Sequence, residues 1–333
     1  MPSLVKITAA MFPELHASLL RELVPSPTEA VWRTAFDGRW TDEDHFGHAL
    51  SDGGRLVGML GMLFSRRQWA GRTARFCNLH TWYVQPEYRG QSLLLMKPVL
   101  ALRDHTVTDF TPSAAVAAIS RRLGFSRLAS QAVVLPLLRP TAANRGETGA
   151  AWQVIQPSAT EMSPTDWQIY GDHQGLHCQH ILLSHAHGYL YIVCPRIDRP
   201  LVPYCYVHYL SDRDRFVRHH ATIRAELARR TACRLVVVDA RLLAGRRTPF
   251  SFRGAALEKL YRPAEVAPSE IDTLYSEVVL FGSPALAGVR QQLRAAAGRL
   301  LPAALRGDRL APGPLDTEKP KTPRGQTWRG GSR

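Results

Sequence analysis

The sequence predicts an α/β chain of two domains, in which sheets are flanked by helices. Three observations support this fold class. Runs of aromatic and branched residues alternate with runs at helical spacing, a polar stretch separates two halves, and the second half repeats the order of the first. The length of 333 residues suits two domains of about 150 residues each.

The first half is predicted to open with a strand at residues 4–7 and a helix at 7–24, where leucines recur at helical spacing. Two prolines end this helix, and Thr28 can cap a second one. An Asp-Gly-Gly turn then joins strand 46–50 to strand 55–64. The later segments are strand 75–84, helix 93–103, strand 105–110, helix 113–123 and strand 127–138.

One stretch, YVQPEYRGQS at residues 83–92, organises this half. The strand before it stops near Pro86, because proline cannot donate to a strand ladder. Arg89, Gly90, Gln91 and Ser92 then lead into a run of good helix formers. A polar turn that enters a helix leaves backbone N–H groups unpaired, and the helix dipole adds attraction for an anion. The stretch therefore predicts a site for a pyrophosphate.

At these residues the chain resembles the GCN5-related N-acetyltransferases (GNAT), a superfamily that moves acyl groups from coenzyme A. The family's signature is a strand ending in V-x-P, then Arg or Gln, two residues, Gly, one residue, and Gly or Ala. Val84, Pro86 and Arg89 fit this signature, whereas Ser92 and Leu94 stand where its two glycines belong. The predicted order of segments over residues 1–138 is also that of the family.

The resemblance implies a mixed, mostly antiparallel twisted sheet flanked by helices. It implies acetyl-CoA or another acyl-CoA as co-substrate, and an amine or hydroxyl as acceptor. Arg89 would pair with the negative phosphates of CoA. The residues expected to hold the co-substrate are Val84, Arg89, Gly90, Gln91, Ser92, Leu93 and Leu94.

Acyl transfer needs a base, a donor that polarises the thioester, and an acid for the leaving thiolate. The family's glutamate base would correspond to His80, whose alternative role is to fill a strand position. The thioester donor would be a backbone N–H near residues 83–85. The family's tyrosine acid corresponds to Ser120, a poor proton donor, so water, Tyr83 or Tyr88 could supply that proton. The expected catalytic residues are therefore His80, Ser120 and Tyr83.

The second half, residues 151–301, is predicted as a degenerate GNAT-like domain, so that the chain is a tandem. Residues 139–150 are the predicted linker, because they are polar, contain Pro and Gly, and show no period. Residues 302–333 are expected to be a disordered basic tail. The segments expected between them are paired strands 180–195 and 201–210, helix 212–230, strand 233–243 and a closing strand 272–281.

The net charge indicates which partners the protein could meet, and the cysteine content indicates the compartment in which it is expected. The net charge of +14 is concentrated in the second half, with a net of +9 over residues 196–262 and +4 over 303–333. Such a basic surface could meet nucleic acid, anionic lipid or an acidic substrate, or could simply be solvated. No nucleic-acid motif accompanies it. Five cysteines, no apolar run long enough to span a bilayer and no signal-peptide pattern predict a cytoplasmic protein of bacterial type.

Histidine and cysteine residues crowd into residues 173–187, but no second pair with zinc-ligand spacing completes them, so no metal is expected. Asp239 and Arg241, at the end of a predicted strand, and Tyr275 and Glu277 in the closing strand are weaker candidates. The leading hypothesis is an acyl-CoA-dependent acyltransferase. The alternatives are a non-catalytic GNAT-fold scaffold that has lost the loop glycines and the acid, and a transferase that uses an aminoacyl-tRNA.

Overall fold

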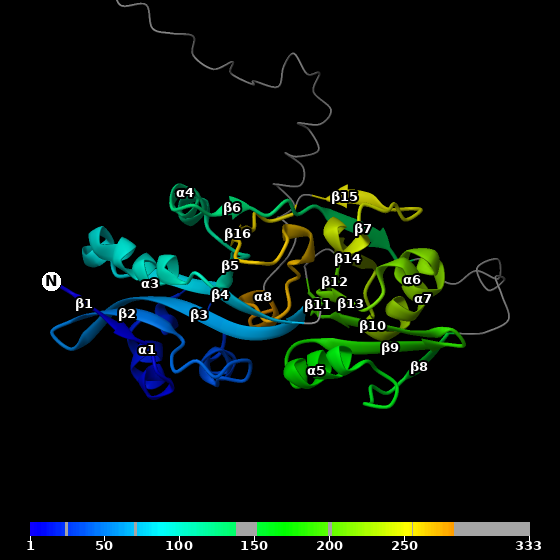
Figure 1. Ribbon diagram of the computed structural model, residues 1–333, viewed down its shortest axis with the longest axis horizontal. Coiled ribbons are helices and arrows are strands. Elements are labelled where there is room, and N and C mark those ends of the chain that lie inside the picture. Colours follow the sequence, from blue (N-terminus) through cyan, green and yellow to red (C-terminus); the bar gives the residue numbers. More distant parts are fainter. Residues whose placement is uncertain (24–25, 70–71, 138–151, 199–201, 255, 283–333) are drawn as a thin grey trace, which may run out of the picture. The chain divides into compact units, whose positions relative to one another are not determined.

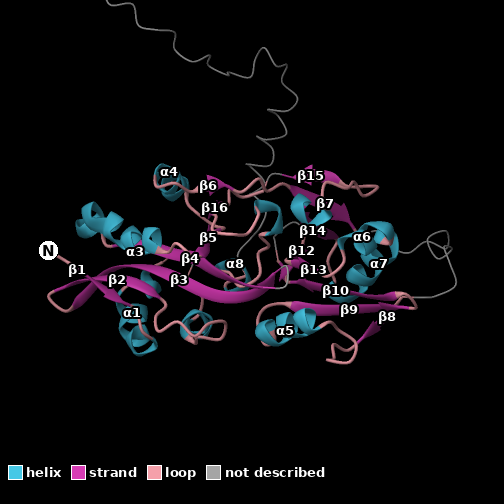
Figure 2. Ribbon diagram, in the orientation of Figure 1, coloured by secondary structure: helices cyan, strands magenta, loops and turns pink. Residues whose placement is uncertain are grey.

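The computed structural model describes residues 1–23, 26–69, 72–137, 152–198, 202–254 and 256–282. The described strands form sheets of seven, four and five strands, with helices packed on them (Figures 1 and 2). Strands β4 and β5 pair in parallel, as do β12 and β14, while the other described pairs are antiparallel. The predicted α/β class with a mixed, mostly antiparallel sheet is confirmed.

The seven-stranded sheet carries most of the first half. Its strands in spatial order are β1 (Ser3–Lys6), β2 (Gly47–Asp52), β3 (Arg55–Trp69), β4 (Arg72–Val84), β5 (His105–Asp109), β16 (Leu260–Arg262) and β6 (Ser126–Arg127). Its helical segments are η1 (Ala9–Met11), α1 (Phe12–Ser18), η2 (Leu20–Glu22), α2 (Glu29–Arg33), η3 (Thr34–Phe36), η4 (Pro86–Leu95), α3 (Met96–Ala101) and α4 (Ala114–Arg122).

The second half contributes the two smaller sheets. The four-stranded sheet has the order β13 (Tyr209–Leu210), β10 (Gly188–Cys194), β9 (Gln179–His185) and β8 (Gln153–Ile155). The five-stranded sheet has the order β11 (Arg196–Ile197), β12 (Tyr204–Val207), β14 (Leu235–Asp239), β7 (Ala132–Pro136) and β15 (Phe252–Gly254). The helical segments are α5 (Pro164–His173), α6 (Arg213–Arg218), α7 (His220–Thr231), η6 (Ala240–Leu243), η7 (Pro268–Glu270) and α8 (Glu277–Leu280).

The two halves exchange strands. The segment predicted as one strand at 127–138 begins at the last residue of β6 and contains β7, and β7 leaves the first sheet to pair with β14 and β15. In return β16, from the far end of the chain, lies between β5 and β6. The seven-stranded and the five-stranded sheets are therefore each completed by a strand from the other half.

The predicted closing strand at 272–281 is wrong. Tyr275 has a φ of +55°, in the left-handed region that bulky residues avoid, so the chain cannot run extended through it. The apolar residues after it form the short helix α8, which lies against β4. A short apolar run without alternation fits a buried helix as well as a strand.

Most other segments keep their predicted type, but the strand predicted at 233–243 ends at Asp239 and is followed by the 3-10 helix η6. The expected helix at 7–24 is a series of short turns around α1, and the helix at 212–230 is broken at His219 into α6 and α7. The predicted linker at 139–150 and the tail at 302–333 lie outside the described residues. No helix in the described part of the chain is long and apolar enough to cross a membrane.

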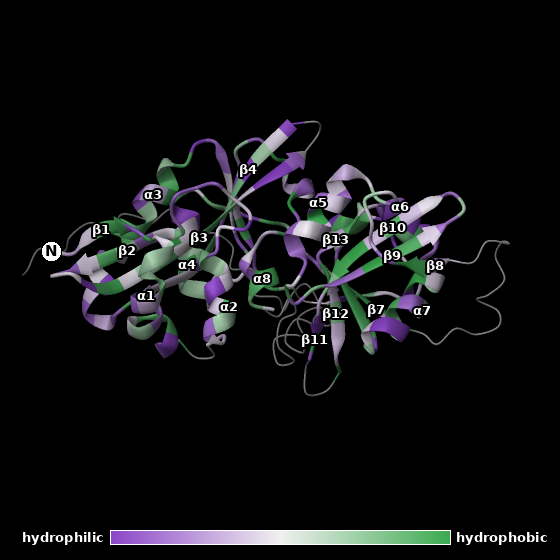
Figure 3. Cartoon of the chain, turned by 90° about the horizontal axis from the view of Figure 1, so that it is seen from below, coloured by the Kyte–Doolittle hydropathy of each residue, from purple (hydrophilic) through white to green (hydrophobic). Residues whose placement is uncertain are grey.

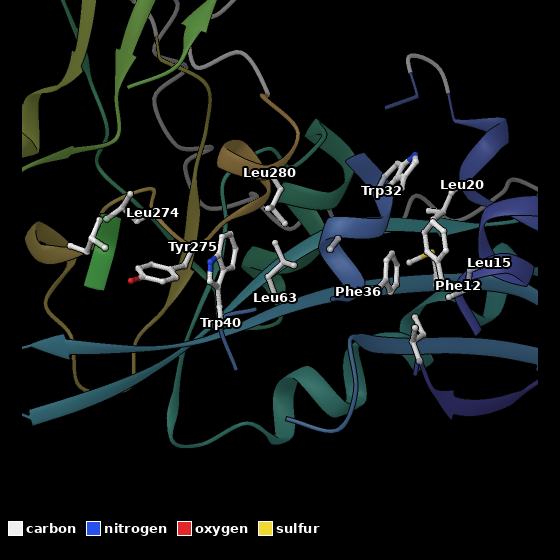
Figure 4. Close-up of a cluster of buried hydrophobic side chains, with 14 of the residues drawn as sticks. Phe12, Leu15, Leu20, Trp32, Phe36, Trp40, Leu63, Leu274, Tyr275 and Leu280 are labelled. Carbon is white, nitrogen blue, oxygen red and sulfur yellow. The ribbon is translucent and has the colours of Figure 1, made fainter. Parts of the chain in front are cut away.

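The hydrophobic core links the halves. Side chains of α1, α2 and β3 share one cluster with the segment that leads into α8, and Figure 4 shows Trp40 and Tyr275 facing each other within it. The ring centroids of these two residues are 5.3 Å apart. Trp40 Nε1 donates to the Asp172 carbonyl (2.9 Å), and Tyr275 Oη donates to Asp172 Oδ2 (2.7 Å). Figure 3 shows the hydrophobic residues gathered on central strands such as β9.

Candidate functional site

The central strands β4 and β5 separate partway along their length. They pair in parallel from Arg75 with His105 to Asn78 with Thr108. Beyond this point β4 runs on to Val84 without β5 beside it. The two strands thus enclose a wedge, which interrupts the sheet at its centre and leaves backbone groups that a neighbouring strand would otherwise bind.

A β-bulge in β4 accompanies this separation. His80 pairs with Gly61 and Tyr83 with Met59, so Thr81 and Trp82 together oppose a single residue of β3. Thr81 has a φ of +51°, which is a genuine outlier for a β-branched residue. Such strain persists only where the surroundings enforce it, and it is frequent at functional sites.

A cavity of about 220 Å³ occupies the wedge. It lies between the bulged part of β4, the end of β5 and the N-terminal turn of α4, where the Ser113 side chain caps the helix by accepting from Val116 N. Its polar lining consists of histidine, threonine, aspartate and serine side chains, and the rest of the lining is apolar. The lining residues are Leu60, Leu79, His80, Thr81, Trp82, Asp109, Thr111, Pro112, Ser113 and Val116.

His80 lines the cavity but is enclosed in the core. Its side chain is 5% exposed and contacts the rings of Phe36 and Phe281, with centroids 6.5 and 5.6 Å away. Nδ1 lies 3.0 Å from Thr81 Oγ1, and Nε2 has no partner in the described structure. Burial lowers the pKa of His80 to about 3, so the ring is neutral at physiological pH and is a weak base.

The other two expected catalytic residues do not line this cavity. Ser120 is buried in α4, and its carbonyl accepts the amides of Leu123 and Phe125. Tyr83 Oη donates to Glu22 Oε2 at 3.4 Å, and burial is the main cause that raises the pKa of Tyr83. Tyr88, the alternative proton source, donates to Asp52 Oδ2 at 2.8 Å. Of the expected catalytic set, only His80 is at the wedge.

The polar turn after β4 is itself helical. Residues Pro86–Leu95 form the 3-10 helix η4, in which N–H groups beyond the first turn bond carbonyls three residues earlier, as Tyr88 N does with the Gln85 carbonyl (2.9 Å), so these amides are engaged rather than free. Among the residues expected to donate to the thioester, Gln85 N donates to the Val57 carbonyl (2.9 Å). Val84 is buried against Gly58, where an added Cβ would come within 2.9 Å of a Val84 methyl group.

The side chains of η4 present a mixed surface. Arg89 and Gly90 are exposed, and a Cβ added at Gly90 would meet nothing within 4 Å. Leu94 packs on the core cluster that contains Val84 and Leu95, so it does not cover this surface, whereas Leu93 is 53% exposed. Gln91 and Ser92 are half-buried. The turn therefore offers side chains, Arg89 foremost, in place of a row of free amides.

Two buried carboxyl groups lie beside the wedge. The sequence pattern marks Glu277 only as a weaker candidate and does not single out Asp109. Asp109, at the end of β5, lines the cavity, and Glu277, at the start of α8, reaches the same end of β5 from the second half. An acidic residue that closes an otherwise apolar or hydroxyl-bearing strand is a signal for Asp109. Nothing in the sequence pairs it with a residue so distant in the chain.

The remaining sequence candidates have structural roles. Asp239 pairs with Arg241 at 2.7 Å and with buried Lys259 at 3.3 Å. His173 Nδ1 binds the Ile169 carbonyl and His180 Nδ1 binds Tyr191 Oη. Within the described residues there is no group of His, Cys, Asp or Glu that could hold a metal ion.

A larger cavity, of about 470 Å³, lies between the end of β3, α5 and residues 209–214 and 270–275. Its charged groups are bound to one another or to neighbours. Arg67 pairs with Asp272 at 2.6 Å, Arg213 with Glu270 at 3.9 Å, and Asp212 Oδ1 caps α6. The wedge, where β4 bulges and parts from β5, is the better candidate site.

Comparison with known proteins points to the same part of the chain. Residues 9–94 match the model of the acetyltransferase (GNAT) family. No curated protein matches the chain. A GCN5-related N-acetyltransferase from Anabaena variabilis aligns at 12% identity with a TM-score of 0.55, covering 80% of this chain and 74% of that one.

Two further solved structures are similar. A GCN5-related N-acetyltransferase from Kribbella flavida aligns at 15% identity with a TM-score of 0.51, covering 79% of this chain and 71% of that one. A protein from Enterococcus faecalis described as a probable N-acyltransferase aligns at 11% identity with a TM-score of 0.55, covering 80% and 74%. At these identities the likeness is one of fold.

Proposed function

We propose that the protein transfers an acyl group from acyl-CoA to an amine or hydroxyl acceptor, because residues 9–94 match the model of the acetyltransferase (GNAT) family and the chain has the fold of GCN5-related N-acetyltransferases. The observation that carries this proposal is the wedge between β4 and β5, with its bulge and its cavity. A sheet opened at its centre can accept an extended amide-containing chain, such as the pantetheine arm, as a substitute strand.

The bulged residues would polarise the thioester. Ladder pairing of β4 with β3 is interrupted at Thr81 and Trp82, and both residues line the cavity. A backbone N–H held there would meet the oxygen charge that develops during acyl transfer, in surroundings from which water is largely excluded. His80 would contribute shape, since its low pKa makes it a weak proton acceptor.

The phosphate end of the co-substrate would lie on η4. Arg89 is exposed there, beside the open surface above Gly90, and a guanidinium can bind two phosphate oxygens at once. Because the η4 amides are engaged, recognition would rest on side chains more than on a helix N-terminus. Gln91, Ser92 and Leu93 would border the phosphates, with Val84 and Leu94 forming the apolar floor.

We propose that the second half is a degenerate GNAT-like domain that completes the first. It returns β16 to the first sheet and packs α8 against β4. The functional unit would then be the whole tandem, with residues 1–138 supplying the wedge and residues 151–301 its support.

A second function, binding without catalysis, is favoured by two observations. Ser120 does not line the cavity, and the η4 amides are engaged. A protein that keeps the wedge but lacks an acid would bind acyl-CoA and leave it intact.

Calorimetric titration with acetyl-CoA tests the proposal. We expect Arg89→Ala to weaken binding about tenfold, since a hydrogen bond to a charged group contributes on the order of 1.5 kcal/mol. Val116→Phe should abolish binding, because the larger side chain fills the cavity. Arg122→Ala, which removes the same charge from the exposed end of α4, is the matched control and should bind like the unaltered protein.

Two results would count against the proposal. The first is an absence of binding at millimolar acetyl-CoA, and the second is equal weakening by Arg89→Ala and Arg122→Ala. Release of the CoA thiol from acetyl-CoA, followed with a thiol reagent, separates the enzyme from the binding protein.

A further inference from the structure

Two carboxyl groups are buried where β4 and β5 part. Asp109 is 8% exposed and Glu277 is 2% exposed, and they come from different halves of the chain. Thr111 lies at both of them, because its Oγ1 donates to Glu277 Oε1 at 3.0 Å and its backbone N–H is near enough to the Asp109 carboxyl to favour that group's charged form. The two carboxyl groups therefore meet around Thr111 at the end of β5.

Hydrogen bonds to β4 and to the end of β5 hold Glu277 in this position. Its Oε1 also accepts the backbone N–H of Phe110 (3.1 Å), a group that is left without a neighbouring strand once β4 has turned away. Its own N–H donates to Asn78 Oδ1 (2.9 Å), and Asn78 Nδ2 donates to Thr108 Oγ1 (3.1 Å). Glu277 Oε2 has no partner in the described structure.

The described cations near the pair are bound to other groups, so they do not offset the repulsion between the two carboxylates. Lys259 is bonded to Asp239 and Tyr206, and Arg67 is paired with Asp272. Burial lowers the pKa of His80 and of His208 to about 3, so both are neutral. In the described parts of the chain neither carboxyl has a salt-bridge partner.

Two carboxylates in such a place do not both ionise at neutral pH. Burial raises the pKa of Glu277 to about 7. Burial, and then the charge of Glu277, raise the pKa of Asp109 well above its ordinary value. Glu277 keeps hydrogen-bond donors that favour its charged form, so the proton resides on Asp109, which is the member that lines the cavity.

We propose that Asp109 and Glu277 hold one proton between them and that Asp109 delivers it to the sulfur of the leaving CoA thiolate. The proposal rests on the acyltransferase function proposed above. It gives the proton-donor role, which Ser120 is not placed to perform, to a residue of the wedge itself. Glu277 is the positioning residue, because its charge keeps the proton on Asp109.

The step conserves atoms and charge. The acceptor nitrogen or oxygen bonds the thioester carbon, the carbon–sulfur bond breaks, and its electron pair goes to sulfur. The Asp109 proton moves to that sulfur and yields the free thiol. The proton lost by the acceptor then returns to the carboxyl pair, which ends the cycle with one proton, as it began.

Infrared difference spectroscopy on the full chain without ligand tests the shared proton. Titrated from about pH 5 to about pH 9, the protein should keep the C=O stretch of a protonated carboxyl above about pH 7, where Glu277 is ionised, and Asp109→Asn should remove the part of the band that persists there. Glu277→Gln keeps an acceptor oxygen but loses the charge, so the band should titrate away at lower pH. The exposed carboxyls of Asp42 and Glu265 give the matched controls Asp42→Asn and Glu265→Gln, which should leave the band unchanged.

Acetyl-CoA tests the proton transfer. With water and a panel of primary amines as acceptors, Asp109→Asn should bind acetyl-CoA within about twofold of the unaltered protein but release CoA thiol about 10²–10⁴-fold more slowly. Glu277→Gln should move the basic limb of the pH–rate profile to lower pH, which a merely structural role would not do.

The results that overturn the proposal are distinct from those that overturn the acyltransferase function. Thiol release and a pH profile unchanged in Asp109→Asn, or a missing infrared band in a protein that turns over acetyl-CoA, refute the shared-proton role alone. A protein that neither binds nor cleaves acetyl-CoA refutes the acyltransferase function and the proton delivery with it.

Discussion

Replacing Gly61 with alanine tests how tightly the strands behind the wedge are packed. A Cβ at Gly61 would lie 2.2 Å from both Cε1 and Nε2 of His80 and 2.7 Å from its Cδ2. The ring would have to move by about 1 Å to reach ordinary contact distance, but Phe36 and Phe281 lie around it. Overpacking of this kind costs about 1–3 kcal/mol, and alanine recovers at most about 1 kcal/mol of backbone entropy. We expect Gly61→Ala to destabilise the protein by about 1–2 kcal/mol.

Urea unfolding of a double-mutant cycle isolates the cause. In a His80→Ala background the clash is gone, so adding Gly61→Ala should cost nothing measurable. Gly171→Ala, in helix α5 where an added Cβ meets nothing within 4 Å, is the matched control and should stabilise slightly. If Gly61→Ala proves as stable as Gly171→Ala, or costs the same with and without His80, the packing of His80 against β3 is not as described.

Two further predictions concern buried charge and pH. Asp239→Ala should destabilise the protein by about 3–5 kcal/mol in urea unfolding, because it leaves Lys259 buried with only the Tyr206 hydroxyl as a partner. Lys259→Met should cost less, because Arg241 still pairs with Asp239. A larger loss of stability in Lys259→Met than in Asp239→Ala would contradict this prediction. Burial lowers the pKa of His80, His173 and His208 to about 3, so the stability they contribute is present above the unfolded pKa near 6.5 and is lost as pH falls toward 3. The slope is about 1.4 kcal/mol per pH unit for each histidine, and the raised pKa of Glu277 opposes it between its unfolded value near 4.5 and about 7. Acid unfolding of His208→Gln should therefore be shallower than that of the unaltered protein, and an unchanged slope would contradict the burial of that ring.

The first half of the fold could be read from local pattern. Prolines, glycine turns and alternating apolar residues give the order of strands and helices up to α4, and the V-x-P end of β4 locates the wedge. His80, expected in this strand, lies in β4 and lines the cavity, while its expected catalytic role stays a prediction. These features depend on residues that are close in sequence, which is why one chain suffices to predict them.

What could not be read depends on partners far apart in the chain. The strand character of β7 is visible, but strand pattern does not say which sheet a strand joins, and β16, in a stretch where no strand is predicted, takes its place in the first sheet. The apolar run in α8 carries no period that separates a strand from a short buried helix. The pairing of Asp109 with Glu277 could not be predicted, because Glu277 lies in this segment, whose pattern is interpreted as a strand. The helical state of η4 is likewise a matter of packing, since Leu94 and Leu95 draw the turn onto the core.

A crystal structure of the protein grown with millimolar acetyl-CoA tests the central claim most directly. The wedge account predicts the thioester between β4 and β5, with its carbonyl oxygen at the Thr81–Trp82 bulge and its sulfur toward Asp109. Acetyl-CoA bound in the larger cavity near Arg67, or a wedge that remains closed to it at saturation, would contradict the account.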